Sequence, residues 1–167
     1  MVYLARFRAL AIVYSAAADT GVLEGLEVEV VGYGNQGRSW ALNMRDSGFR
    51  PRVCVRADAT GQQAEADGFD TGDIEVASGA DVVCLLGPDD AIPALPIEYD
   101  AGTTVVVASG YTPAFDRLDV PGDIVMIAPR MLGSEVRSCY LDGSGFITAI
   151  GVEQDNPGSA RGRMLAV

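Results

Sequence analysis

The sequence predicts an α/β protein, a single Rossmann-like domain built on a doubly wound, mostly parallel sheet. The first observation is a G-x-G-x-x-G motif, Gly32 to Gly37, which follows an apolar run and opens a segment with helical periodicity. The second is a series of short, almost continuous apolar runs, which are typical of parallel strands covered on both faces. The third is the absence of any repeat or linker that would divide the 167 residues into two domains.

A β-turn-α-β unit surrounds the glycine motif. The expected elements are a strand over 26–31, a helix over about 36–47 and a strand over 52–56. Trp40, Ala41 and Met44 form one apolar stripe along that helix. Gly48 stands where a left-handed residue ends a helix, and Pro51 prevents its continuation. Such a unit implies two parallel strands joined by a right-handed crossover.

Further elements follow in the rest of the chain. The expected strands are 81–87, 103–110, 123–129 and 145–153, the last being antiparallel or at an edge of the sheet. A short helix is expected from Ala59, closed near Gly68, whereas the stretch from Pro88 to Thr103 leaves little room for one. The final segment begins like a helix where the chain stops, so we expect a truncated chain or a missing downstream domain.

Composition and charge exclude several classes of function. The 12 basic and 23 acidic residues give a net charge of −11, which disfavours nucleic acid or an anionic membrane surface as a partner. The chain has no histidine and every basic residue is arginine. A His base, a His metal ligand, a Ser-His-Asp triad and a lysine Schiff base are therefore excluded within this chain. No stretch is long and apolar enough to span a membrane.

Three cysteines, Cys54, Cys84 and Cys139, are far apart and form no C-x-x-C pair, which argues against zinc and fits a reducing cytoplasm. Cys54 and Cys84 lie in strand-like runs, where a free cysteine packs as a small apolar side chain. The N-terminal stretch 6–19 loosely resembles a signal peptide, but its apolar run is short and Tyr14 interrupts it. We therefore expect a cytoplasmic protein.

The spacing of the glycines fits a dinucleotide. Gly32 permits a tight turn, Gly34 lets a pyrophosphate approach the backbone, and Gly37 lets the helix pack closely on the strand. The helix N-terminus supplies free N–H groups and a partial positive charge. The alternative is a glycine-rich turn that binds nothing.

The choice between NAD and NADP depends on the end of the second strand. Arg56 favours NADP, because an arginine pairs with a 2′-phosphate or stacks on adenine. Asp58 would repel that phosphate and favours NAD, whereas Thr60 hydrogen-bonds either ribose. A solvated strand-end charge is the alternative for Arg56. The cofactor is therefore NAD or NADP, with a slight preference for NADP.

The ordered motifs resemble the nucleotide-binding domain of ketol-acid reductoisomerase, also called acetohydroxy acid isomeroreductase. The resemblance runs from about Val13 through "LEGLEVEVVGYGNQGRSWALNMRDSG", "EADGF", "ADVVCLLGPDD", "VVVASGY", "DIVMIAPRMLGSEVRSCYLDGSGF" and "AIGVEQDNPGSA". It implies an N-terminal Rossmann domain followed by a helical domain. It also implies an enzyme of branched-chain amino-acid biosynthesis that uses NAD(P)H and Mg²⁺ to isomerise an acetohydroxy acid and reduce the product.

The resemblance also implies a set of cofactor-binding residues. The phosphate turn comprises Gly32, Tyr33, Gly34, Asn35, Gln36 and Gly37. The residues expected to face the adenosine ribose are Arg56, Asp58 and Thr60. Those expected along the nicotinamide are Leu86, Gly87, Pro88, Ala108, Ser109 and Gly110.

The catalytic residues of the family are not all present. The family's "HGF" triplet is Ser109-Gly110-Tyr111 here, and Arg130 replaces the lysine of its "APKGPG" motif. Ser109 and Tyr111 could donate a hydrogen bond, and Tyr111 is the only proton donor in that loop. Arg130 could orient a substrate carboxylate but cannot act as a general acid. These three are the candidate catalytic residues, with packing of Tyr111 on the sheet end as its alternative.

No metal site is expected in this chain alone, because the carboxylates that bridge the family's magnesium ions belong to its second domain. Asp89 and Asp90 are best explained by a solvated loop. Glu135 lies where the family often has an acidic residue, but a charge at a helix N-terminus explains it at least as well.

The expected function is an NAD(P)-dependent oxidoreductase that reduces a 2-keto acid, an acetohydroxy acid or a related carbonyl or imine. The alternatives are a non-catalytic dinucleotide-binding or sensor module and a subunit that needs a partner chain. The expected partners are a small-molecule substrate and either a second copy or a chain with a helical domain, since an open sheet would expose an apolar patch.

Overall fold

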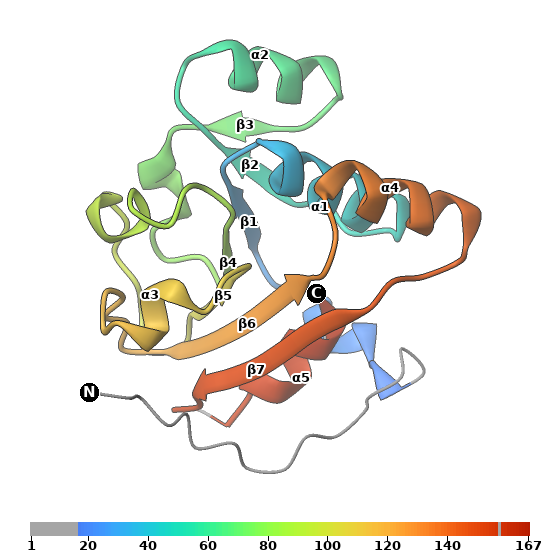
Figure 1. The fold of residues 1–167 in the computed structure, drawn as a ribbon. Coiled ribbons are helices and arrows are strands. Elements are labelled where there is room, and N and C mark those ends of the chain that lie inside the picture. The colour runs from blue at the N-terminus through green and yellow to red at the C-terminus, as the bar shows by residue number, and fades with distance from the viewer. Residues whose placement is uncertain (1–16, 157) are drawn as a thin grey trace.

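The computed structural model describes residues 17–156 and 158–167. The signal-like stretch of the N-terminus lies almost wholly outside these residues. Seven strands form one sheet in the order β3-β2-β1-β4-β5-β6-β7 (Figure 1). The strands are β1 (Val28–Val31), β2 (Arg52–Cys54), β3 (Thr71–Gly72), β4 (Val82–Leu85), β5 (Thr104–Val107), β6 (Asp123–Pro129) and β7 (Thr148–Gln154). All neighbouring pairs are parallel except β6 and β7.

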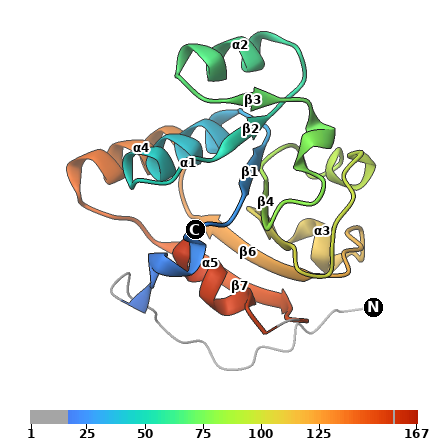
Figure 2. The same ribbon diagram turned by 180° about the vertical axis from the view of Figure 1, so that it is seen from behind.

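The helices and 3₁₀ turns cover both faces of this sheet. The helices are α1 (Asn35–Asp46), α2 (Ala59–Ala66), α3 (Tyr111–Ala114), α4 (Gly133–Asp142) and α5 (Ala160–Ala166). The 3₁₀ turns are η2 (Thr20–Leu23), η3 (Ile74–Ala77) and η4 (Ile92–Ala94). Figures 1 and 2 show α1 and α4 side by side on one flank of the sheet, with α3 on the other. The predicted doubly wound α/β fold is confirmed.

Two apolar clusters form the core, one on each face of the sheet. The helical face packs Trp40, Ala41 and Met44, the predicted stripe of α1, against Val30 and Val53. The opposite face is covered by η3, η4 and extended chain. Buried valines on β1, β2, β4, β5 and β6 follow from the continuous apolar runs, because parallel strands covered on both faces favour apolar side chains on either side.

Most predicted elements are present: β6 has the predicted bounds, and the other predicted strands are shorter than expected. The last strand is antiparallel and lies at the edge, as predicted. The stretch after Pro88 contains only η4, as its composition indicated. Only the start of α4 was considered, as the alternative for Glu135, and its extent was not predicted. The short helix α3 and the two-residue strand β3 were not predicted at all. Among the described residues no helix has the length and apolarity needed to cross a bilayer.

The strand order places the switch point of the fold between β1 and β4. The chain moves outward from β1 to β2 and β3, then returns to β4 on the other side and moves toward β7. The connections after β1 and β4 therefore diverge, which opens a crevice at their carboxyl ends. This is where a doubly wound sheet binds its ligand.

Candidate functional site

A cavity of about 440 Å³ lies at the carboxyl ends of β1, β2 and β4. Nine of the predicted cofactor residues line it: Gly32, Tyr33, Gly34, Arg56, Asp58, Thr60, Leu86, Gly87 and Pro88. Asp90, which the sequence analysis assigned to a solvated loop, lines it as well. They come from the glycine turn, from the loop after β2 and from the loop after β4. The fold therefore brings most of the predicted cofactor residues into one space.

Each glycine of the motif has a different structural reason to lack a side chain. Gly32 has φ 94°, and a Cβ there would lie 3.1 Å from the Gly87 nitrogen. A Cβ on Gly37 would overlap the Gly32 carbonyl oxygen. Gly34, by contrast, has nothing within 4 Å of its Cβ position and no strained backbone. The first and third glycines serve the fold, and the second leaves open space beside the start of α1.

The start of α1 is suited to an anion. Gly34 is its N-cap and offers no side-chain acceptor. The N–H groups of the first turn of a helix have no partner within the helix, and the helix dipole makes this end partly positive. A phosphate placed over Gly34 would meet these donors.

The side chains of Asn35 and Gln36 point toward α4. The Gln36 Nε2 donates to the Met131 carbonyl over 3.0 Å, and Asn35 Oδ1 accepts from the Ser134 N–H over 3.2 Å. A Cβ on Gly133 would overlap the Asn35 backbone, so α4 starts in direct contact with α1. Asn35 and Gln36 thus join two helices, although Gln36 Oε1 is buried without a hydrogen-bond partner. Their backbone N–H groups face the start of the helix, where a cofactor phosphate would lie.

The loop after β2 carries the three residues predicted at the ribose. Asp58 is the N-cap of α2 and accepts from the Thr60 N–H over 2.9 Å and from the Thr60 hydroxyl. These hydrogen bonds hold the pKa of Asp58 below its usual value. Arg56 lies 3.7 Å from the Asp58 carboxylate, and its side chain is 82% exposed. Asp58 is therefore occupied as a helix cap, while Arg56 extends into solvent at the cavity.

The wall of the cavity includes apolar residues that the sequence analysis did not assign to a site. They are Val31, Cys54, Val55, Ile74, Ala91, Ile92 and Leu95. Cys54 is fully buried, as predicted for a small apolar side chain, and its thiol donates to the Glu29 carboxylate over 3.1 Å. Burial, with Glu29 close by, raises the pKa of this thiol to about 12. The only sequence signal for these wall residues was their position at or after the ends of strands.

Ser109 and Gly110, predicted along the nicotinamide, lie outside the lining of this cavity. The Ser109 hydroxyl donates to Asp89 over 3.0 Å and accepts from the Tyr111 N–H over 3.1 Å. Gly110 lines a separate small hollow of about 130 Å³ beside β6 and β7. The Ser109 hydroxyl thus already donates its proton in a hydrogen bond within the chain.

Tyr111 and Arg130, the other catalytic candidates, also lie outside the cavity lining. The Tyr111 hydroxyl accepts from Arg117 over 3.1 Å, and its side chain is exposed at the start of α3. Arg130 is exposed directly after β6. The structure brings Ser109 and Tyr111 together at one turn, but it does not bring Arg130 into contact with them.

Glu135 caps α4. Its carboxylate accepts from the Leu132 N–H over 3.2 Å, which is the helix-terminal role that the sequence left open for it. Asp89 and Asp90 lie in the turn after β4. In residues 17–156 and 158–167, no group of three or more Asp, Glu or Cys side chains is arranged to hold a metal ion.

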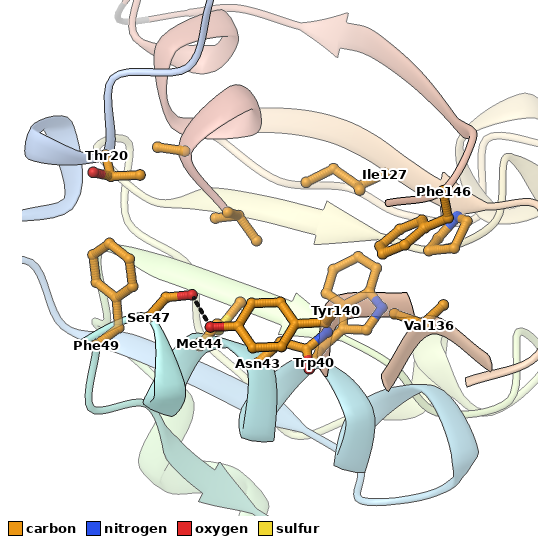
Figure 3. A pocket seen from close by; sticks show the side chains of 13 residues that line it. Thr20, Trp40, Asn43, Met44, Ser47, Phe49, Ile127, Val136, Tyr140 and Phe146 are labelled. Carbon is orange, nitrogen blue, oxygen red and sulfur yellow. Dashed lines mark hydrogen bonds between the residues drawn. The ribbon is translucent and has the colours of Figure 1, made fainter. Parts of the chain in front are cut away.

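A second, mainly apolar cavity of about 210 Å³ lies between α1, α4, β6 and the C-terminal end of α5 (Figure 3). Its polar feature is a hydrogen bond of 2.8 Å between the hydroxyls of Ser47 and Tyr140. Asp, Glu, Arg and Cys side chains are missing from its lining. It therefore offers mainly apolar packing surface without charged groups, and the cavity at the glycine turn is the candidate site.

Comparison with known proteins agrees with this geometry. Residues 22–167 match the family model described as "Acetohydroxy acid isomeroreductase, NADPH-binding domain". The chain is 40% identical over 158 residues to the ketol-acid reductoisomerase (NADP(+)) of Caldivirga maquilingensis, covering 90% of this chain and 48% of that protein. It is 36% identical over 164 residues to the ketol-acid reductoisomerase (NADP(+)) of Akkermansia muciniphila, covering 93% and 50%. The chain thus spans about half the length of these relatives.

Solved structures give the same picture. An NADH-preferring ketol-acid reductoisomerase from an uncultured archean superposes with a TM-score of 0.89 at 30% identity, over 94% of this chain and 52% of that one. An imine reductase from Aspergillus terreus in complex with NADPH4 matches at a TM-score of 0.53 and 16% identity, over 65% and 43%. At that identity the second likeness concerns the fold alone.

Proposed function

We propose, since this chain belongs to the acetohydroxy acid isomeroreductase family and matches its NADPH-binding domain, that it binds NADP(H) in the cavity at the glycine turn. The observation that carries the proposal is the open space at Gly34, between two glycines that the fold itself requires. A pyrophosphate fits there without displacing a side chain, and α1 presents its N–H groups to it.

NADP rather than NAD is the proposed cofactor. The exposed Arg56 can pair with a 2′-phosphate, whereas Asp58 is held as a helix cap by Thr60. The relatives from Caldivirga and Akkermansia are named for NADP(+). The archaeal structure is of an NADH-preferring enzyme, so the family accepts both cofactors.

The proposed reaction is that of the family: reduction of a 2-keto or acetohydroxy acid in branched-chain amino-acid biosynthesis. Bound NADPH would supply the hydride. This chain would bind the adenosine and pyrophosphate and present the nicotinamide at the ends of β4 and β5. Because Ser109 and Tyr111 hydrogen-bond within the chain, we assign neither a proton-transfer role. The described residues do not provide a metal-ligand set, and no metal-dependent step is derived from them.

A further region is proposed to complete the site. The chain covers about half of its relatives, so a helical domain, in this protein or in a partner chain, would supply the remaining catalytic groups.

We also propose a homodimer, a small-molecule substrate and a cytoplasmic location. Cys54, Cys84 and Cys139 are all free, which favours a reducing compartment. Family membership favours the oxidoreductase over a non-catalytic sensor module.

Direct titration tests the proposal. NADPH and NADH are added to the chain and nicotinamide fluorescence is followed, with NADPH expected to bind more tightly. Absence of binding of both cofactors at millimolar concentration would reject it. In a parallel assay with acetolactate, Mg²⁺ and NADPH, the chain alone is expected to show no turnover. Turnover would show that the replaced residues suffice.

A further inference from the structure

The carboxylate of Asp67, directly after α2, collects hydrogen bonds from three parts of the chain. It accepts from the Tyr33 hydroxyl over 2.9 Å, from Arg38 Nε over 2.6 Å and Nη2 over 3.1 Å, and from Gln63 Nε2 over 3.2 Å. Tyr33 belongs to the glycine turn, Arg38 to α1 and Gln63 to α2. The Asp67 side chain is only 15% exposed. We call these four residues the Asp67 cluster.

Tyr33 connects this cluster to the phosphate turn. It is the residue between Gly32 and Gly34, it is 4% exposed, and its ring meets Phe69 edge-on with centroids 5.7 Å apart. With its ring packed and its hydroxyl bonded, the side chain cannot turn toward the cavity. Its backbone, however, forms the turn itself. Holding the Tyr33 ring therefore fixes the turn on which the pyrophosphate would rest.

A second contact joins Asp67 to the far end of α1. Arg45 donates to the Asp67 carbonyl oxygen over 2.7 Å, and its guanidinium carbon lies 5.3 Å from the centre of the Phe69 ring. Residues in the first and last turns of α1 thus hydrogen-bond to the segment after α2. Since α2 begins with the Asp58 cap and has only eight residues, fastening its end also fixes its start.

The charges in the cluster favour a permanently ionised carboxylate. Hydrogen bonds from the Arg38 guanidinium hold the pKa of Asp67 at about 2, with smaller contributions from Tyr33 and Gln63. Burial, and then Asp67, raise the pKa of the Tyr33 hydroxyl, which stays protonated and donates. The same donors therefore face the same acceptor across the physiological pH range.

We infer that Asp67 is a positioning residue for the cofactor: through Tyr33 and Arg38 it holds the phosphate turn at a fixed place relative to the ribose loop on α2. This inference rests on the proposed NADP(H) site. A dinucleotide must meet both surfaces at once, so a clamp that sets their spacing before binding lowers the entropic cost of binding. Asp67 itself does not line the cavity.

Three variants and one matched control test the inference. Tyr33→Phe removes one hydroxyl and leaves the packed ring, Asp67→Asn removes the charge, and the third variant combines both. The control is Asp46→Asn, because Asp46 also joins two arginines, Arg45 and Arg137, but lies in the last turn of α1. The probes are NADPH and adenosine 2′,5′-bisphosphate, titrated well below the unfolding midpoint of each variant.

We expect each single variant to bind both probes about 5- to 10-fold more weakly, which is about 1 kcal/mol of binding free energy. The double variant should bind the probes no more than about twofold more weakly than the weaker-binding single variant, because both changes disrupt the same set of hydrogen bonds. Asp46→Asn should bind within about twofold of the unchanged chain.

The remaining outcomes overturn the inference in distinguishable ways. If the unchanged chain binds neither probe, the proposed function fails and the inference fails with it. If the unchanged chain binds but Asp67→Asn binds equally well, only the positioning role fails. Equal losses in Asp67→Asn and Asp46→Asn would indicate a general effect of stability. Tighter binding by Asp67→Asn would show that the released Arg38 contacts phosphate instead.

Discussion

The glycine turn with its ribose loop and the turn after β5 are two neighbouring regions built on the same sheet edge, yet they use their polar groups differently. In the first region, Gly34 and Arg56 present open space and an exposed charge to one cavity. In the second, Ser109 donates to Asp89, and Tyr111 accepts from Arg117. The first region leaves an exposed charge and open space at a cavity, whereas the hydroxyls of Ser109 and Tyr111 in the second are hydrogen-bonded within the chain.

Under the proposed function, this difference places cofactor binding and catalysis in different parts of the chain. A phosphate turn depends on backbone shape and a helix end, which a single β-turn-α unit can supply. A catalytic set needs side chains that converge from several elements, and here Arg130 is apart from Ser109 and Tyr111.

Gly37→Ala should destabilise the protein most. Its Cβ would overlap the Gly32 carbonyl oxygen, so α1 must shift away from the strand. We expect a loss of about 3 kcal/mol in the free energy of unfolding, as for overpacked cores. Urea denaturation measures it, with Gly102→Ala as the control, because nothing lies within 4 Å of that Cβ position. An unchanged midpoint for Gly37→Ala would contradict the role of close packing.

Gly34→Val should separate folding from binding. Its Cβ position is open and its backbone unstrained, so replacing this N-cap glycine should lower the free energy of unfolding by no more than about 1 kcal/mol. The added side chain would occupy the phosphate position, and we expect NADPH affinity to fall about 30-fold, or about 2 kcal/mol. Fluorescence titration measures it. Unaltered affinity in the folded variant would place the pyrophosphate elsewhere.

Arg56→Ala should change cofactor preference. The exposed guanidinium is available for a 2′-phosphate, so NADPH affinity should fall about tenfold, whereas NADH affinity changes by no more than about twofold. Arg50→Ala is the control, since Arg50 is also exposed but lies near the amino ends of the strands. Equal losses for both cofactors would mean that Arg56 stacks on adenine rather than pairing with phosphate.

Lowering the pH should decrease the free energy of unfolding, because Asp67 becomes protonated. Its pKa is lowered to about 2 in the folded protein, chiefly by Arg38, so its contribution is present above about pH 4 and is lost as the pH falls toward 2. Allowing for solvent screening, we expect this contribution to be about 1 kcal/mol. The free energy of unfolding, measured from pH 6 to pH 2, should fall less steeply for Asp67→Asn. Identical slopes would contradict the ion pair with Arg38.

The sequence predicted the parts of the molecule that depend on local pattern. Continuous apolar runs revealed the central strands, and glycine spacing located the phosphate turn. The α4 helix was missed because only Gly133 and Val136 of its ten residues are buried, which leaves no clear apolar stripe. Its position is set instead by contact of Gly133 with α1.

Side-chain directions in the site were not accessible from local pattern. Gln36 was expected at the phosphates, but its side chain contacts Met131, 95 positions away. Tyr33 was expected at the same place; it lines the cavity, but its hydroxyl donates to Asp67, 34 positions away. Such partners are determined by packing of whole helices, and "EADGF" gave no indication that its aspartate would serve the glycine turn.

The smallest effect is expected in the turn after β5. Tyr111→Phe removes a hydroxyl that accepts from Arg117 at an exposed position, and Ser109→Ala removes the bond to Asp89. Neither residue lines the cavity, so NADPH affinity should stay within about twofold, and stability should fall by no more than about 1 kcal/mol. Titration and thermal unfolding of both variants measure this. A tenfold loss of NADPH affinity in either variant would show that the turn closes over the bound nicotinamide, and the two regions would then act as one site.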